Sequence, residues 1–476
     1  MRTNFKILFC LFIGIVYAPM GYGKIILPAL VGDNMVLQQK SEVSIWGKAK
    51  VRSGVSAVTS WDNKKYQTQS LADGSWRMKI TTPAAGGPYS ITLSDGEKLT
   101  LNNILVGEVW VCSGQSNMSM PMIGYKNQPI KDSNTELLLA NNPNIHLFTV
   151  ERNAIRSPQA DCIGKWEVSS PQVARMFSAI GFEFATILEA SLQVPIGIIH
   201  SSWGGTPIEA WMSEESLKSF PHAKMIPSSD TSPVLPRNPA SLFHGMINPL
   251  LSYGIRGFLW YQGEANRDAY ARYDSLMTTM ITDWRSRWGR GDLPFYYVQL
   301  APFAYPKKLD NSAFLRESQL RVMQQVPGVG MAVAMDVGEE NYIHPSNKSE
   351  ISKRLAFWAL AKTYGWEGLA YSGPVYKEMK ISEDKVQLTF SYASNGLSSL
   401  GKELTGFEIA AEDRVFYPAQ AIINGDGVIV QHDQIKKPVA VRYAFKDWVV
   451  GSLYNVEGLP ASSFRTDTWE NTKTNP

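Results

Sequence analysis

The sequence predicts an α/β protein in which a doubly wound parallel sheet is flanked by an N-terminal and a C-terminal β-sandwich region. Two observations carry this prediction. Over residues 104–371, short apolar runs alternate with segments of helical spacing, as expected for parallel strands joined by helices. Over residues 24–103 and 372–476, short runs of alternating apolar and polar residues stand between turn signals, which is typical of β-sandwiches.

The chain opens with a segment, residues 1–23, that is typical of a secretory signal peptide. Arg2 and Lys6 precede an apolar run over residues 7–17, and small residues follow that run. The apolar run is too short to cross a bilayer, and no later run is long enough. We therefore expect a secreted or periplasmic protein without a membrane span.

Composition excludes several classes of function. Removal of residues 1–23, which contain two of the 46 Lys and Arg, leaves 44 of them against 43 Asp and Glu. A nearly neutral chain without a basic tract is not expected to bind nucleic acid. No His, Cys and carboxylate cluster has metal-ligand spacing, so we expect no metal and no cofactor. Spacing leaves open whether Cys112 and Cys162 pair, and composition does not indicate the oligomeric state.

Residues 24–103 are expected to form the first β-sandwich region. Residues 43–47 and 75–80 alternate apolar and polar side chains, and turn signals such as Asp73-Gly74 separate these runs. This region holds no cluster of titratable residues. We therefore expect it to be structural, or to shape the rim of a site that lies elsewhere.

The central residues supply the strands and helices of the predicted sheet. The expected strands cover residues 104–112, 194–200, 257–261, 295–300 and 330–335. The expected helices cover residues 182–192, 275–287 and 349–364. Because parallel strands end at one edge of their sheet, the side chains that follow them are expected to meet there.

Two further regions complete the predicted architecture. Residues 227–239 are rich in Pro and Ser and predict a surface loop that borders the site. The C-terminal region carries four short strand-like runs, over residues 386–390, 406–410, 428–430 and 439–443. These runs predict the second β-sandwich region. Since chain termini often lie close together, we expect the two β regions to pack against each other.

The stretch that follows the first central strand is the strongest candidate for chemistry. Residues 113–118 read Ser-Gly-Gln-Ser-Asn-Met, which predicts a glycine turn and then a helix start. Ser116 would present its hydroxyl at the carboxyl edge of the sheet, a position suited to a nucleophile, but the local pattern alone favours a serine that merely caps the helix. The G-x-S-x-G elbow does not fit, because Met118 stands at the place of its second glycine.

Several segments, in order along the chain, resemble one family of hydrolases. Residues 114–118 resemble the first block of the SGNH/GDSL hydrolases, in the branch of the sialate O-acetylesterases. Matching segments follow at Ser202–Trp211, Trp260–Asn266 and Ile343–Lys348, and the flanks match at Asp33–Gln38 and Gly458–Asp467. The resemblance covers nearly the whole chain after residue 23, and four blocks in order are highly specific.

The resemblance implies an SGNH-type fold and a secreted serine carbohydrate esterase. Its substrate would be an O-acetylated sugar, with 9-O-acetylated sialic acid favoured and acetylated xylan or another plant glycan as the alternative. Two other hypotheses remain. One is a non-catalytic glycan-binding protein with a decayed site, and the other is a glycosidase that uses Glu209 and Glu264.

A serine nucleophile needs a base, and six histidines are available. His222 and His432 lie in polar turns, while His146 and His200 lie in strand-like runs that favour the core. His244 is a candidate to line the cleft. The sixth, His344, stands in a strand-to-helix loop, and the resemblance points to it as the general base.

The oxyanion of an acyl transfer needs hydrogen-bond donors. Ser116 supplies its own amide. The resemblance adds the backbone amide of Gly205, with Gly204 as its neighbour, and the side-chain amide of Gln262. Taken alone, the glycine pair also reads as a plain turn and Gln262 as a polar residue at a strand end.

The group that orients the base is not evident, because the chain departs from the family pattern. SGNH enzymes carry an aspartate three residues before the histidine, where this chain has Asn341, and Tyr342 stands where sialate esterases often have an acid. The candidate acids are Asp336, Glu339 and Glu340, and a backbone carbonyl is the alternative.

The remaining site candidates come from the same blocks. Glu264 is expected to be a buried carboxylate that holds the loop around Gln262, and not an acid catalyst. The substrate-binding candidates are Gln115, Asn117, Trp203, Asn266 and His244. The expected partner is an acetylated carbohydrate.

Overall fold

The computed structural model describes residues 24–227, 229–306 and 309–469, so the predicted leader lies outside the described residues. Within them, seven strands form the central sheet in the order β13-β12-β11-β7-β10-β8-β9. They are β7 (Lys98–Gly114), β8 (Ile145–Thr149), β9 (Trp166–Val168), β10 (Ile196–Ser202), β11 (Gly257–Tyr261), β12 (Phe295–Val298) and β13 (Val329–Ala332). All pairs are parallel except β8 with β9. The predicted α/β class is confirmed.

Helices cover both faces of this sheet. They are α4 (Ala179–Leu192), α6 (Tyr273–Trp288), α7 (Asn311–Gln325) and α8 (Lys348–Trp358). Successive residues of a strand point to opposite faces, and β7 shows this. Trp110 packs on Phe184 of α4 with ring centroids 5.3 Å apart, whereas Val111 belongs to the core that holds Trp284 of α6. Burying a side chain such as Phe184 stabilises the fold by about 1.5–3 kcal/mol.

The order of the strands places a crevice at the end of β7. The chain passes from β7 through β8 to β10 on one side, and then continues to β11 on the other. Gly114, the last residue of β7, pairs with Ser202 of β10 and with Tyr261 of β11. Ligands bind at such points of reversal in open α/β sheets. Three of the four chemical blocks therefore begin side by side.

The N-terminal region continues from the amino end of β7. Its other strands are β1 (Val36–Gln38), β2 (Glu42–Lys48), β3 (Gly54–Thr59), β4 (Lys65–Gln69), β5 (Ser75–Thr81) and β6 (Gly86–Ser94). The first half of β7 pairs with β1 and β6, and the second half pairs with β10 and β11. One uninterrupted strand thus joins the N-terminal region to the central sheet.

The C-terminal region contains two four-stranded sheets and one short pair. The strands are β14 (Val375–Ser382), β15 (Lys385–Ser391), β16 (Leu397–Ser398), β17 (Phe407–Ala410), β18 (Phe416–Pro418), β19 (Gln420–Asn424), β20 (Gly427–Gln431), β21 (Ala440–Tyr443), β22 (Tyr454–Asn455) and β23 (Phe464–Arg465). The region packs on α7, where Phe314 lies edge-on to Phe445 at 4.9 Å and Glu317 pairs with Arg465 at 2.8 Å.

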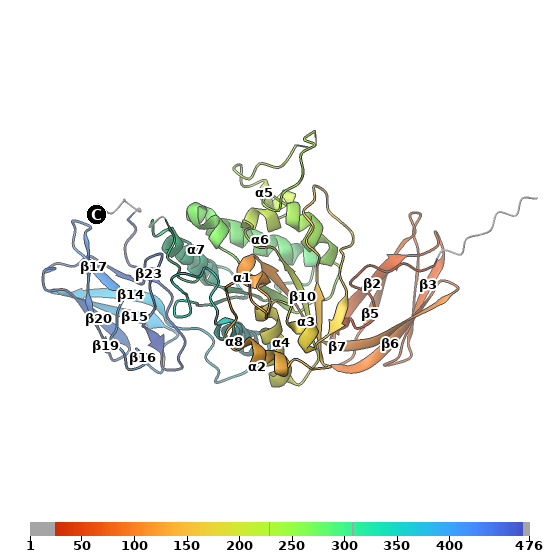
Figure 1. Ribbon diagram of the computed structural model, residues 1–476, viewed down its shortest axis with the longest axis horizontal. Coiled ribbons are helices and arrows are strands. Elements are labelled where there is room, and N and C mark those ends of the chain that lie inside the picture. The colour runs from red at the N-terminus through yellow and green to blue at the C-terminus, as the bar shows by residue number, and fades with distance from the viewer. Residues whose placement is uncertain (1–23, 228, 307–308, 470–476) are drawn as a thin grey trace, which may run out of the picture.

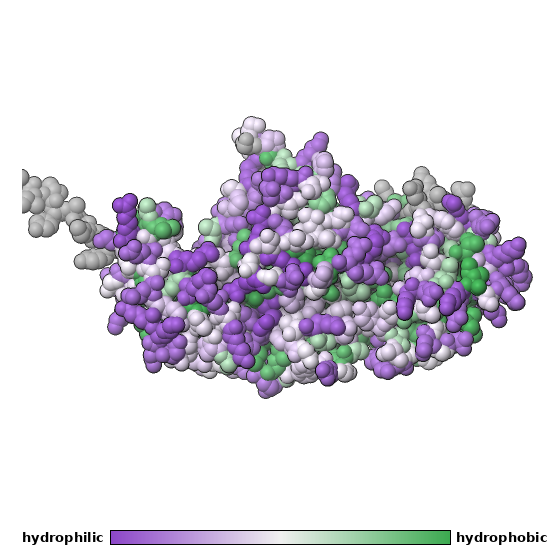
Figure 2. All heavy atoms as spheres, turned by 180° about the vertical axis from the view of Figure 1, so that it is seen from behind, coloured by the Kyte–Doolittle hydropathy of each residue, from purple (hydrophilic) through white to green (hydrophobic). Residues whose placement is uncertain are grey.

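The expectation that the two β regions pack together is wrong. Figure 1 shows them at opposite ends of an elongated molecule, with the central sheet and its helices between them. The reason is their anchorage, because the N-terminal strands extend from β7 whereas the C-terminal sheets pack on α7. Seen from behind, the surface mixes hydrophilic and apolar residues, with an apolar strip over the C-terminal region (Figure 2).

The predicted central elements agree closely with the observed ones. The helix expected at 275–287 is α6, and the helix expected at 349–364 is α8 followed by a π-helical turn, Ala359–Thr363. Helix α7 has no counterpart among the predictions. Among the described residues, no helix has the length and apolar character that crossing a membrane requires.

Candidate functional site

Ser116 stands at the crevice because of the glycine before it. Gly114 has a φ of +136°, and a Cβ there would lie 2.2 Å from the carbonyl oxygen of Tyr261, so only glycine fits between the neighbouring strands. The Gln115 amide then donates to that carbonyl at 2.9 Å, and α1 (Ser116–Ser119) begins. The Ser116 side chain is half-buried at this turn.

The turn after β10 packs directly on the serine. The Trp203 amide donates to the Gly114 carbonyl at 3.1 Å. A Cβ on Gly204 would lie 3.1 Å from the Cβ of Ser116, so the lack of a side chain allows the close approach. Gly205 follows with a φ of +72° and is exposed. Within the described residues, the amides of Ser116 and Gly205 have no intramolecular acceptor, so both remain available to a ligand.

His344 reaches the same place from the loop between β13 and α8. Its Nδ1 lies 2.6 Å from Oε1 of Gln128. Because an amide oxygen only accepts, Nδ1 carries the proton and Nε2 is the basic nitrogen. In the described part of the chain Nε2 has no hydrogen-bond partner. Burial and the nearby Lys348 lower the pKa of His344 to about 4, so the ring is neutral at physiological pH.

Two residues join the serine to the histidine loop. The Tyr125 hydroxyl donates to the Ser116 carbonyl at 3.1 Å, and the Tyr125 ring lies 5.2 Å from the His344 ring between centroids. Asn117, next to Ser116, donates to the carbonyl of Ile343 at 3.1 Å. No direct hydrogen bond between Ser116 and His344 occurs across the described ranges. Catalytic hydrogen bonds are often long before substrate binds.

Of the three acids proposed to orient His344, two are engaged elsewhere and the third is exposed. Asp336 forms a bidentate ion pair with Arg354, at 2.7 Å for both bonds. Glu339 accepts from the amide and hydroxyl of Ser346 and so supports the loop after His344. Glu340 is exposed. The contact with the ring belongs to Gln128, which the sequence analysis did not single out.

The structure also corrects the expected role of Gln262. Its side chain is fully buried, and Nε2 donates both hydrogens, to the Thr206 carbonyl at 3.2 Å and to Oδ1 of Asn266 at 2.7 Å. Its Oε1 accepts from the Tyr273 hydroxyl at 2.7 Å. With both hydrogens occupied, Gln262 has none for an oxyanion. It ties the turn after β10 to the one after β11.

A buried polar network lies beneath the serine. Asn117 donates to Glu264 Oε1 at 2.5 Å and accepts from Lys348 Nζ at 2.5 Å. Burial raises the pKa of Glu264 and lowers that of Lys348 to about 7. Glu264 is half-buried, and the network of its carboxylate joins its loop to α1 and α8.

Most of the substrate-binding candidates turn out to hold the site together. Gln115 is buried, and its Oε1 accepts from the amides of Gly263 and Ala265 at 3.4 and 3.3 Å. Asn117 and Asn266 are also buried, and Asn266 donates to Glu209 at 2.9 Å. None of the three offers a free face to a sugar. Each of the three side chains bonds to main-chain groups of a neighbouring turn, which is a structural reason for its place in the sequence motifs.

Two other candidates lie in different surroundings. Trp203 is half-buried, and its ring lies 5.7 Å from the guanidinium of Arg152. His244 is buried, with Nδ1 3.3 Å from the Ile155 carbonyl and Nε2 3.4 Å from Glu214. It lines a small cavity together with residues of the loop at 225–239. His244 therefore lies under that loop and not beside Ser116.

Two arginines flank the site. Arg237 donates from Nη1 to the Gly205 carbonyl at 2.6 Å, from the loop predicted to border the site. Arg152 is exposed beside Trp203. Burial raises the pKa of Tyr125, whereas its bond to Ser119 and the charge of Arg152 lower it, so Arg152 lies within electrostatic range of the site. Neither arginine forms an ion pair within the described residues.

Other groups with possible chemistry are accounted for by packing. His146 and His200 are buried, as their strand positions predicted, and burial lowers the pKa of His200 to about 3. Cys112 and Cys162 are unpaired thiols. Among the described residues, no group of three or more His, Cys, Asp or Glu side chains is arranged to hold a metal ion.

Comparisons with known proteins show the family of the chain. Residues 106–360 match the sequence profile of the family described as "Carbohydrate esterase, sialic acid-specific acetylesterase". The chain is 29% identical over 408 residues to the sialate O-acetylesterase of Homo sapiens, across 76% of this chain and 75% of that protein. The corresponding enzyme of Pongo abelii is 28% identical over 463 residues, across 88% and 87%.

A solved structure extends the likeness to three dimensions. The crystal structure of a carbohydrate acetylesterase from Xanthomonas citri superimposes with a TM-score of 0.85 at 36% identity, covering 94% of this chain and 100% of that chain. The family match spans more than half of the chain and includes the segments that carry Ser116, Gly205 and His344. The chain therefore belongs to the sialic acid-specific acetylesterase family of carbohydrate esterases and is a carboxylic ester hydrolase.

Proposed function

We propose that this esterase is secreted and removes O-acetyl groups from sugars, with 9-O-acetylated sialic acid as the substrate, through a Ser116 nucleophile and a His344 base. The observation that carries the mechanism is the 2.6 Å bond from His344 Nδ1 to Gln128. That bond fixes the tautomer whose Nε2 accepts a proton. Tyr125 and Asn117 hold this ring next to the serine.

Each step of the reaction has a group to perform it. Ser116 Oγ attacks the acetyl carbonyl carbon while His344 Nε2 takes its proton. The amides of Ser116 and Gly205 donate to the oxyanion, and each such donor is worth about 10²–10³ in rate. The intermediate collapses when the protonated Nε2 returns the proton to the departing sugar oxygen. Water then attacks the acyl-serine by the same route and releases acetate.

An anionic sugar is supported by the charges around the mouth of the site. Arg152 beside Trp203 and Arg237 on Gly205 both lack a carboxylate partner among the described residues. A guanidinium group binds a carboxylate by paired hydrogen bonds. The carboxylate of sialic acid is such a partner, whereas the acetylated xylose units of a xylan are neutral.

The mechanism is tested by the Ser116→Ala variant. Acetate release from nitrophenyl acetate and from O-acetylated sialic acid is expected to fall by about 10⁴-fold or more. Retention of full activity would eliminate Ser116 as the nucleophile. A wild-type chain that binds glycans but releases no acetate would instead support a decayed site.

The substrate is tested separately with the wild type. We expect kcat/KM for O-acetylated sialic acid to exceed kcat/KM for its carboxyl methyl ester and for acetylated xylo-oligosaccharides. Equal or faster turnover of the xylo-oligosaccharides would assign the enzyme to plant glycans and leave the Ser116 mechanism intact.

A glycosidase mechanism has little support. Glu209 accepts from Asn266 and lies 3.3 Å from His222, and Glu264 accepts from Asn117. Both carboxylates are therefore committed to contacts that hold the turns around the serine.

A further inference from the structure

A second hollow lies between the N-terminal β region and the central unit, apart from the residues of the serine site. Its volume is about 680 Å³, within the range of about 300–1,000 Å³ that is usual for small-molecule sites. One wall comes from β2, β4 and β5, and the other from Ala160 and the segment Asn248–Ser252, which follows a second π-helical turn, Phe243–Ile247. Clefts between such units are favoured places for ligands.

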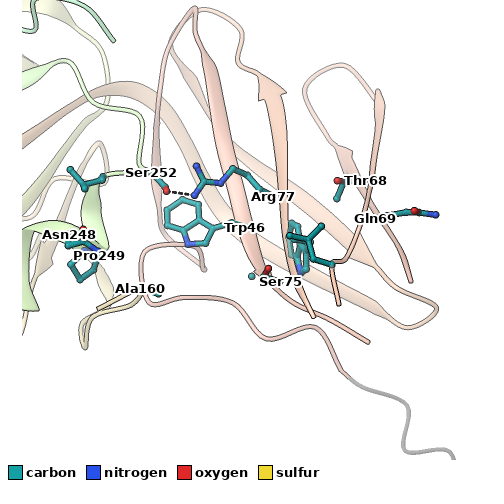
Figure 3. A pocket seen from close by; sticks show the side chains of 13 residues that line it. Trp46, Thr68, Gln69, Ser75, Arg77, Ala160, Asn248, Pro249 and Ser252 are labelled. Carbon is teal, nitrogen blue, oxygen red and sulfur yellow. Dashed lines mark hydrogen bonds between the residues drawn. The ribbon is translucent and has the colours of Figure 1, made fainter. Parts of the chain in front are cut away.

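Trp46 forms an aromatic wall of this hollow. In β2 the residues Val43 and Ile45 are buried in the core, so Trp46 points from the opposite face of the strand. Figure 3 shows its indole facing Asn248 and Pro249 across the hollow. The ring is half-buried and lies edge-on to Tyr253, with centroids 6.3 Å apart. It is therefore held in place before any ligand arrives.

Polar groups with unused hydrogen-bonding capacity surround the indole. Arg77 lies directly opposite Trp46 in the β2–β5 pair, and its Nη2 donates to the Ser252 hydroxyl at 2.6 Å (Figure 3). Nε and Nη1 of Arg77, the hydroxyl hydrogen of Ser252 and Oδ1 of Asn248 have no partner among the described residues. Donors and an acceptor thus stand beside an exposed ring face.

We propose that this hollow is an accessory binding site for a sugar unit of the glycan on which the esterase acts. A pyranose has an apolar C–H face that packs on an indole, and its hydroxyls both donate and accept hydrogen bonds. The hollow provides both an indole face and groups that donate and accept hydrogen bonds. Binding here would not depend on Ser116 as the nucleophile, because none of the residues of the serine site lines the hollow.

The site is tested by calorimetry with full-length Ser116→Ala, which cannot consume its ligand if the mechanism holds. The probes are sialyllactose and acetylated xylo-oligosaccharides of increasing length. We expect Trp46→Ala, added to Ser116→Ala, to raise Kd for the longer probe about tenfold. Trp366→Ala is the control, because Trp366 is a surface tryptophan (44% exposed) that lies outside the hollow.

A second variant, Arg77→Gln, tests the same site even if Trp46→Ala does not fold. Arg77→Gln keeps a polar side chain on the exposed face of β5 and should weaken the same binding about threefold, with an unchanged thermal melt. If Kd for every probe stays the same in both variants, the accessory site is absent. That result would leave the serine mechanism untouched, because the comparison of nitrophenyl acetate hydrolysis by the wild type and by Ser116→Ala tests it independently.

Discussion

The two halves of the proposed catalytic site are built in different ways. The half that carries Ser116 is held by backbone, since Gly114, two residues before Ser116, lies between β10 and β11, and the Trp203 amide bonds to the same glycine. The base half is held by side chains, because His344 lies on a loop that Gln128, Asn117 and Glu339 fix. Close backbone packing tolerates little change, whereas a side-chain contact can be replaced and its effect tuned.

Among variants that keep Ser116 and His344, the largest effect is expected in the backbone half, from Gly205→Ala. Alanine at a φ of +72° costs about 1–2 kcal/mol and displaces the amide that we assign to the oxyanion. We expect kcat to fall about 10²–10³-fold, measured with nitrophenyl acetate. Gly365→Ala is the control, since Gly365 has the same φ of +72° and open space around it. Equal losses of activity in the two variants would mean that strain alone is responsible.

An intermediate effect is expected in the side-chain half, from Gln128. Gln128→Ala removes the acceptor of Nδ1–H, so the ring is free to turn, and we expect kcat to fall about 10–100-fold. Gln128→Glu keeps the acceptor and adds a negative charge, which raises the pKa of His344 from about 4.

The dependence of kcat/KM on pH shows whether Gln128 acts on the His344 ring or only supports the loop. The neutral ring is the base, so wild-type activity should fall only as pH decreases through about 4. In Gln128→Glu the acid limb of kcat/KM should move to higher pH. An acid limb that stays in place while kcat drops would show that Gln128 supports the fold of its loop and not the ring.

The smallest effect is expected at the rim, from Arg152→Gln. Loss of one exposed guanidinium should raise KM for O-acetylated sialic acid about three- to tenfold more than KM for its methyl ester. Arg52→Gln, an exposed arginine of the N-terminal region, should change neither value. An identical change in KM for acid and ester would remove the carboxylate from the role of Arg152.

The difference between the halves also explains what the sequence could predict. Gly114, Ser116 and Gly205 follow apolar runs that read as strands, so local pattern was enough to place them at one edge. Gln128 stands in an irregular segment 216 residues from His344, and no local signal marks it. Asp336 looked suitable in sequence, but Arg354 on α8 takes both of its oxygens.

Helix α7 was missed for a related reason. Ser312, Arg316, Ser318 and Gln319 are buried in it among apolar residues such as Phe314 and Leu315, so polar residues interrupt the apolar periodicity of its inner face. The Arg316 guanidinium donates to Ser463 and to carbonyl groups of the C-terminal region. A helix buried through polar contacts is recognisable only after its partners are known.

The most direct test of the account is to identify the acylated residue. The wild type is mixed with a fluorophosphonate, digested, and the labelled peptide is sequenced by mass spectrometry. Labelling of Ser116, at a rate that falls as pH decreases through about 4 and is slowed in Gln128→Ala, is the predicted result. Labelling of another residue, with Ser116 unmodified at full inhibition, would contradict the central claim.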